Sequence, residues 1–124
     1  MAAMNNAKVF AGNSNPELAN KIVKVLRTRL GKIDLERFSD GEIRCEINEA
    51  VRESTIHIIQ STCAPTNDSL MELLIMSDAF KRSAAKKVIA VVPYYGYARQ
   101  DRRPQYTRTP VTSRLVAEMI QVSG

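Results

Sequence analysis

The stretch that decides the fold is Val88-Ile-Ala-Val-Val-Pro93, which is followed by Tyr94-Tyr-Gly-Tyr97 and Ala98-Arg-Gln-Asp-Arg-Arg103. A short, continuous apolar run predicts a buried strand of a parallel sheet, and we expect 88–92 to be the central strand. The ligands of α/β folds bind at the carboxyl ends of such strands. A cationic, aromatic-flanked loop at that place indicates an anionic, ring-bearing ligand, with a nucleotide as the first candidate. The alternative is a solvated basic loop.

Charge is distributed unevenly along the 124 residues. The net charge is +5, but residues 1–80 hold nine Lys and Arg against eleven Asp and Glu, whereas residues 81–124 hold nine against two. This asymmetry favours an anionic partner for the last third of the chain. Hydrophobic residues make up 44% and charged residues 25% of the chain, which is typical of one globular domain.

Neither a membrane span nor a secretory signal is expected. No window of about 18 apolar residues exists, and the start, from Met1 to Lys8, lacks the apolar core of a signal peptide. Cys45 and Cys63 show no metal-ligand spacing. We therefore expect reduced thiols in a cytoplasmic protein that has no membrane partner.

Strands are predicted at four places besides 88–92. Short apolar segments at Lys8–Ala11 and Thr55–Gln60 indicate two further strands of the sheet. Between them, Ile33 to Ile47 has the alternation of a hairpin, with its turn at Asp40-Gly41. Since helical patterns separate the sheet strands, we predict an α/β fold: a mainly parallel sheet flanked by helices, with a protruding β-hairpin.

Three helices are predicted from capping residues and apolar periodicity. The first begins after Asn15 and is expected to end at Gly31. A loop at 65–68 is followed by Ser69-x-x-Glu72, which fits a capping box for the second helix. Thr109-Pro110 is expected to open the third helix. Its inward-facing residues are predicted to be Val111, Leu115, Met119 and Ile120.

Arg99-Gln100-Asp101 is the first candidate for nucleotide binding. The chain has neither G-x-x-x-x-G-K-[ST] nor G-x-G-x-x-G, so side chains and loop amides would have to hold the phosphates. A guanidinium binds phosphate oxygens at two points or stacks on a base, and an amide reads a base or ribose edge. Asp101 is expected to orient the arginine. The alternative is an exposed ion-pair network.

Phe38-Ser-Asp-Gly-Glu42 is the second candidate. Phe38 offers a ring face for base stacking, and the carboxylates of Asp40 and Glu42 can accept protons from an exocyclic amine. The alternative is a plain hairpin turn beside a packed phenylalanine.

Other chemistry finds less support in the sequence. His57 stands alone among isoleucines, and no serine has a histidine beside it, so neither a metal site nor a nucleophilic triad is predicted. The tyrosines at 94, 95 and 97 lie close to arginines in the sequence, a combination that nucleic-acid binders use. The basic segment is short, however, and we expect no nucleic-acid partner.

Four motifs follow one another in the order and spacing of one family. They are Phe38–Glu42, Gln60–Leu74, Tyr97–Arg102 and Arg108–Thr112. In these motifs the chain resembles ribose-phosphate pyrophosphokinase, also called phosphoribosyl pyrophosphate synthetase, and the resemblance spans nearly the whole sequence. It implies a phosphoribosyltransferase-like α/β domain, the N-terminal one of two, and a homo-oligomeric enzyme.

The resemblance also implies a reaction. Members of the family transfer the β,γ-diphosphoryl group of ATP to the C1 hydroxyl of ribose 5-phosphate, with Mg²⁺, and release phosphoribosyl pyrophosphate and AMP. Matching positions imply that Arg99 and Gln100 contact ATP. They also imply an adenine contact, usually on the neighbouring subunit, for the hairpin residues Phe38, Asp40, Gly41 and Glu42. Arg52 and Arg108 match positions near a regulatory phosphate site. Ala50 departs from members that carry serine there, which puts regulation through that hydroxyl in doubt.

By the same resemblance, residues 1–124 are the N-terminal domain of a longer protein, truncated before its metal-binding histidine, catalytic loop and ribose-phosphate loop. We therefore expect these residues alone to be inactive, with no catalytic or metal residue among them. A non-catalytic regulatory homologue of the synthetase and a small nucleic-acid binder are the alternative hypotheses.

Overall fold

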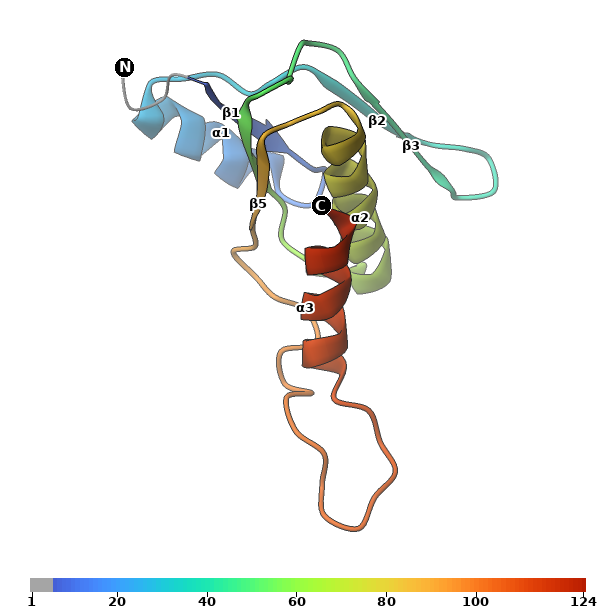
Figure 1. The fold of residues 1–124 in the computed structure, drawn as a ribbon. Coiled ribbons are helices and arrows are strands. Elements are labelled where there is room, and N and C mark those ends of the chain that lie inside the picture. Colours follow the sequence, from blue (N-terminus) through green and yellow to red (C-terminus); the bar gives the residue numbers. More distant parts are fainter. Residues whose placement is uncertain (1–5) are drawn as a thin grey trace.

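The computed structural model describes residues 6–124, so part of the segment from Met1 to Lys8, on which the expectation of no secretory signal rests, lies outside it. Three strands within the described residues form a parallel sheet (Figure 1). The strands are β1 (Ala7–Ala11), β4 (Thr55–Ile59) and β5 (Lys87–Val91), in the order β1-β4-β5. The prediction that the run after Val88 is central is therefore wrong, because β4 is the strand paired on both sides. An apolar run signals burial but does not distinguish the middle of a sheet from its edge.

Helices cover the two faces of the sheet unequally (Figure 1). On one face, Phe10, Ile56 and Ile58 pack against α2 (Thr66–Arg82), which in turn contacts α3 (Thr112–Ser123). On the other face, a smaller cluster lies against α1 (Pro16–Leu26), and it consists of Val9, Ala19, Val23 and Ile59. Because neighbouring strand residues point to opposite faces, β1 and β4 each contribute to both clusters.

An antiparallel hairpin projects from this body, as predicted (Figure 1). It consists of β2 (Ile33–Arg37) and β3 (Ile43–Ile47), and its turn lies at Asp40-Gly41, where Gly41 has a φ of +94°. The apolar residues at its base pack against the main core: Ile33, Leu35, Cys45 and Ile47. The tip has no such support, so it extends into solvent.

Helix α1 begins where the sequence predicts but ends earlier. The Asn15 side chain accepts a hydrogen bond from the N–H of Leu18 at 3.1 Å, as a capping residue does. The helix stops at Leu26 because Arg27 adopts a left-handed conformation, with a φ of +56°. Gly31 is no helix cap, because Arg27 already caps α1 four residues earlier. A Cβ at position 31 would lie 2.3 Å from the ring of Phe10. The glycine permits close packing instead.

The other two helix starts also differ from the prediction. Helix α2 begins at Thr66, inside the expected loop, so Ser69 and Glu72 lie buried within the helix and form no capping box. Helix α3 begins at Thr112 instead of Thr109-Pro110. Val116 is the buried residue of α3, whereas Leu115 remains 49% exposed. No helix within residues 6–124 is long and apolar enough to cross a membrane.

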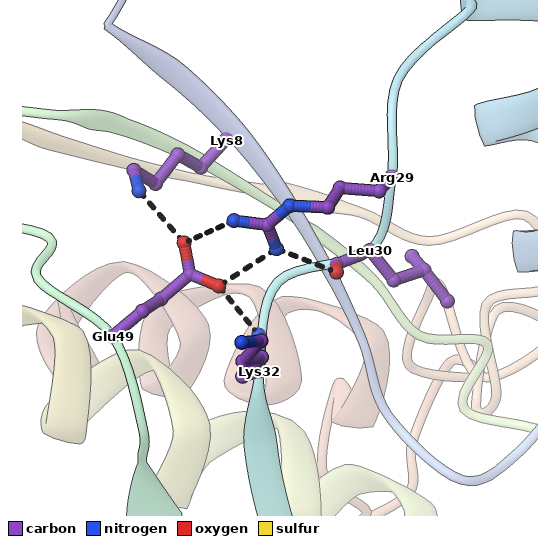
Figure 2. Close-up of polar contacts among 5 residues, drawn as sticks. All are labelled: Lys8, Arg29, Leu30, Lys32 and Glu49. Atoms are coloured by element: carbon purple, nitrogen blue, oxygen red, sulfur yellow. Dashed lines mark hydrogen bonds and ion pairs between the residues drawn. The ribbon is translucent and has the colours of Figure 1, made fainter.

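One carboxylate joins two connecting segments and strand β1 at the amino edge of the sheet (Figure 2). Glu49 accepts hydrogen bonds from Lys8 Nζ at 2.7 Å, from the Arg29 guanidinium at 2.9 and 3.3 Å, and from the Lys32 N–H at 2.7 Å. These hydrogen bonds, chiefly that from Arg29, lower the pKa of Glu49 to about 2 although burial opposes the shift. The β3–β4 connection is thereby tied to β1 and to the α1–β2 connection.

We expect Glu49→Gln to lower the free energy of unfolding at pH 7 by about 1–3 kcal/mol. The shift from 4.5 to about 2 sets an upper limit of about 3 kcal/mol, and the exposure of Arg29 reduces it. Since the folded-state pKa is depressed, the stabilisation is fully present above pH 4.5 and is lost as the pH falls through about 2. Urea denaturation of the parent and of Glu49→Gln at pH 7 and at pH 3 measures the difference in their free energies of unfolding.

Glu53→Gln is the matched control, because Glu53 is exposed on the same connection and makes no ion pair with any residue from 6 to 124. Equal stabilities of the parent and Glu49→Gln at pH 7 would contradict the prediction.

Candidate functional site

The three strands of the sheet end at a common edge, where polar residues gather. Because β1, β4 and β5 are parallel, their carboxyl ends lead into Gly12–Ser14, Gln60–Thr62 and Val92–Tyr94 respectively. The first turn of α2 follows directly after the β4 connection, so its free N–H groups lie at the same edge. This is the position at which α/β folds bind ligands.

A buried polar network forms the floor of this edge. Glu72, only 4% exposed, accepts hydrogen bonds from the Asn13 N–H at 2.6 Å and from Gln60 Nε2 at 3.0 Å. Gln60 in turn accepts from the Ser14 hydroxyl at 2.7 Å. A Cβ at position 12 would lie 2.2 Å from Gln60 Oε1, so only glycine fits there. A cavity of about 150 Å³ opens above the network.

A larger cavity, of about 430 Å³, lies beside it. It is lined by Thr66 at the start of α2 and by the continuous segment 94–100. Arg99 and Gln100, the first predicted nucleotide contacts, therefore line the largest hollow at this edge. Tyrosine rings supply apolar surface, and the guanidinium and amide supply polar groups, which is the mixture typical of small-molecule sites.

The arginines of the adjoining loop have no ion-pair partner in the part of the chain that the structure describes. Arg99, Arg102, Arg103 and Arg108 are exposed, and none of them forms an ion pair within residues 6–124. The alternative of an exposed ion-pair network is therefore not observed, nor does Asp101 hold Arg99 in the described part of the chain. Four unpaired guanidinium groups in one loop make it strongly attractive to an anion.

The second group of predicted contacts lies elsewhere on the molecule. Phe38 is 53% exposed next to the hairpin turn. Asp40 accepts the Glu42 N–H at 2.9 Å, and this hydrogen bond lowers the pKa of the Asp40 carboxyl. The hairpin tip and the loop that contains 99–110 point in different directions (Figure 1). No hydrogen bond or ion pair joins the two predicted contact groups within residues 6–124, although Arg37, next to Phe38, lies 3.6 Å from Asp68 in the first turn of α2.

Arg52 and Arg108, the predicted regulatory residues, are likewise separated. Both are exposed, the first on the β3–β4 connection and the second in the long loop before α3. Figure 1 shows these two segments at opposite ends of the ribbon. Arg52 and Arg108 could therefore bind the same anion only if they came from two different subunits.

Metal and nucleophile chemistry gains no support from residues 6–124. No group of three His, Cys, Asp or Glu side chains in that range is placed to hold a metal ion. Cys45 and Cys63 are both free thiols, as predicted. Burial is the main cause that raises the pKa of Cys45 to about 11, which makes its thiolate scarce at neutral pH.

Sequence reasoning missed the groups that shape the site. Gln60, Thr62 and Glu72 are each less than 5% exposed yet carry hydrogen-bonding side chains. The available signal was a run of polar residues directly after a buried strand, together with one glutamate inside the apolar stretch Leu70–Met76. A charged residue on a buried helix face requires hydrogen-bond partners from other elements.

Comparison with known proteins decides the family. Residues 7–124 match the family model described as the N-terminal domain of ribose phosphate pyrophosphokinase. The chain belongs to the ribose-phosphate pyrophosphokinase family. It is 52% identical to the ribose-phosphate pyrophosphokinase of Burkholderia pseudomallei over 124 residues, and 55% identical to that of Clostridium perfringens over 119. These alignments cover 100% and 96% of this chain.

The structural comparison agrees with the ribose-phosphate pyrophosphokinase family. The crystal structure of phosphoribosylpyrophosphate synthetase from Mycobacterium smegmatis matches 96% of the chain with a TM-score of 0.92 and 41% identity. This confirms the predicted phosphoribosyltransferase-like α/β fold. The chain spans 40% of that structure, and 39% and 37% of the Burkholderia and Clostridium relatives.

The hairpin tip yields a prediction about Gly41. No atom lies within 4 Å of a Cβ built there, but the φ of +94° is unfavourable for any residue with a side chain. Gly41→Ala should therefore destabilise the turn by about 1–2 kcal/mol. Amide hydrogen exchange at Phe38 and Gly41, whose N–H groups bond across the turn at 2.7 and 2.9 Å, should accelerate.

Ser39→Ala is the control in the same turn, because it also changes an exposed position but leaves the glycine in place. Unchanged exchange in Gly41→Ala would show that the turn tolerates a Cβ at this φ.

Proposed function

We propose that this chain is the ATP-binding N-terminal part of a ribose-phosphate diphosphokinase. The whole protein transfers the β,γ-diphosphoryl group of ATP to the C1 hydroxyl of ribose 5-phosphate and forms phosphoribosyl pyrophosphate and AMP for nucleotide biosynthesis. One observation carries the proposal beyond the family: Arg99 and Gln100 line the 430 Å³ cavity at the ligand-binding edge of the sheet, and the arginine makes no ion pair within residues 6–124.

The proposed chemistry depends on positioning and charge neutralisation. The C1 hydroxyl oxygen of the sugar attacks the β-phosphorus of ATP, the bond from that phosphorus to the α–β bridging oxygen breaks, and AMP leaves with that oxygen. The hydroxyl proton passes to water. Such transfers proceed when cations stabilise the charge that spreads over the phosphoryl oxygens. Arg99 supplies one such cation, and no residue of this chain is assigned as a base or nucleophile.

Mg²⁺ enters the proposal with the nucleotide. This ion is commonly held by substrate phosphates and one or two carboxylates, and it retains several waters. The described residues offer no three-ligand cluster for it. We therefore assign no metal ligand to residues 6–124 and derive no step from the metal.

A homo-oligomer completes the proposed ATP site. The hairpin tip, which carries Phe38, Asp40, Gly41 and Glu42, points in a different direction from the loop that follows β5 (Figure 1). If they contact the same ATP, the hairpin belongs to one subunit and the arginine loop to its neighbour. We likewise propose that Arg52 of one subunit and Arg108 of its neighbour form a regulatory phosphate site.

A direct assay separates this proposal from its alternative. We place the whole protein in the cytoplasm. AMP formation from ATP and ribose 5-phosphate with Mg²⁺, measured on the purified protein that carries this chain, tests the reaction. A protein that binds ATP but releases no AMP would favour the non-catalytic regulatory homologue. Binding to nucleic acid in place of ATP, abolished by salt, would favour the nucleic-acid hypothesis.

Arg99→Ala should weaken ATP binding by a factor of about 10 to 150. This factor corresponds to the loss of one charged contact, about 1.5–3 kcal/mol. Titration calorimetry measures the dissociation constant. Arg82→Ala is the matched control, because Arg82 is exposed at the far end of α2, where it pairs with Asp78 at 2.9 Å. Equal weakening by both changes would point to net charge alone.

Phe38→Ala should weaken ATP binding less, by about 1 kcal/mol for a lost ring contact. Mixing the Arg99→Ala and Phe38→Ala proteins tests the shared site. In a mixed pair of subunits, one site lacks both groups and the other regains both, so part of the ATP binding should return. The absence of any rescue on mixing would contradict a site built from two subunits.

A further inference from the structure

The segment 94–97, here called the tyrosine turn, connects the end of β5 to Arg99 and rests against the buried residue Thr62. Thr62, 1% exposed, lies in the connection between β4 and α2. Its N–H donates to the carbonyl of Tyr94 at 2.9 Å. Its hydroxyl accepts the N–H of Gly96 at 2.7 Å and donates to the carbonyl of Tyr94 at 3.4 Å.

Gly96 makes this contact possible. A Cβ at position 96 would lie 2.3 Å from the carbonyl oxygen of Thr62 and 2.6 Å from Thr66 Cγ2. The turn therefore sits directly on the backbone of the β4–α2 connection, with no space between them. The Gly96 N–H is buried there and has the threonine hydroxyl as its acceptor.

Further contacts transmit this placement to Gln100. The Tyr97 hydroxyl bonds to Asn67 Oδ1 in the first turn of α2. The Gln100 N–H donates to the carbonyl of Tyr97 at 2.9 Å, and the Gln100 carbonyl accepts the N–H of Ser113 at 3.0 Å. The backbone around Arg99 is thus held between α2 and α3.

We infer that Thr62 is a positioning residue for the nucleotide, because its hydroxyl holds the tyrosine turn that presents Arg99 and Gln100 to the cavity. The inference rests on the proposed function. The side chain of Arg99 is exposed and has no ion-pair partner within residues 6–124, so only its backbone fixes where it lies. A backbone that is ordered before binding need not be ordered by the ligand, and the affinity is correspondingly higher.

The test compares Thr62→Val with Thr62→Ser. Valine has nearly the shape of threonine but cannot accept the Gly96 N–H, whereas serine keeps the hydroxyl. We expect Thr62→Val to weaken ATP binding about 10-fold, the factor for one lost hydrogen bond, and Thr62→Ser to remain within about 3-fold of the parent. Titration calorimetry gives the affinities, and amide hydrogen exchange at Gly96 and Gln100 reports whether the turn has loosened.

Ile58→Val serves as the stability control. Ile58 is fully buried in β4, away from the cavity lining, so this change lowers stability without touching the turn. It should leave the ATP affinity and the exchange at Gly96 unchanged. Tyr97→Phe, which removes only the hydroxyl that contacts Asn67, provides a second test if Thr62→Val fails to fold. It should also weaken ATP binding and accelerate exchange at Gln100.

The outcomes distinguish two failures. A parent chain that binds no ATP would overturn the proposed function and the role of Thr62 with it. A parent that binds ATP while Thr62→Val, or Tyr97→Phe in its place, binds equally tightly would overturn only the positioning role. Faster exchange with unchanged affinity would also overturn the positioning role, because Thr62 would then be purely structural.

Discussion

The carboxylate of Glu72, buried in α2, is the group on which the arrangement of the site depends. A buried charge is tolerated only when hydrogen bonds replace the water it has lost. Here the donors are the Asn13 N–H, the Asn13 side-chain amide at 3.1 Å and Gln60 Nε2. Asn13 follows the end of β1 and Gln60 follows the end of β4, so these hydrogen bonds hold α2 against both strands. The start of α2 is thereby placed where it lines the cavity that contains Arg99.

Charge is used differently at the two edges of the sheet. At the amino edge, Glu49 is surrounded by Lys8, Arg29 and the Lys32 N–H, and these groups are matched within the chain (Figure 2). At the carboxyl edge, the arginines of the loop 99–110 have no ion-pair partner in the described residues. Matched charges contribute to folding, whereas unmatched charges of one sign create a field that attracts an anion. The described residues thus separate their paired charges from their unpaired ones.

Two exposed segments project from this domain of the ribose-phosphate pyrophosphokinase family. The hairpin packs at its base and leaves Phe38 exposed at its tip, while the loop that contains 99–110 extends in another direction (Figure 1). Neither projection gains stability from its exposed end. Such segments are typical of surfaces that contact a ligand or another subunit.

The sequence by itself determined the fold class, the hairpin with its Asp40-Gly41 turn, the capped start of α1 and the family. These features depend on local periodicity, on glycine at a positive φ and on motifs read in order, all of which are carried by neighbouring residues. The tertiary structure alone decided that β4 is central, that Thr66 begins α2, and that Val116 rather than Leu115 is buried. It also decided that Glu72 bonds to Asn13 and Gln60, and that Thr62 holds Gly96. These last contacts join residues 12 to 59 positions apart, and no local pattern specifies which distant donor a buried acceptor will meet.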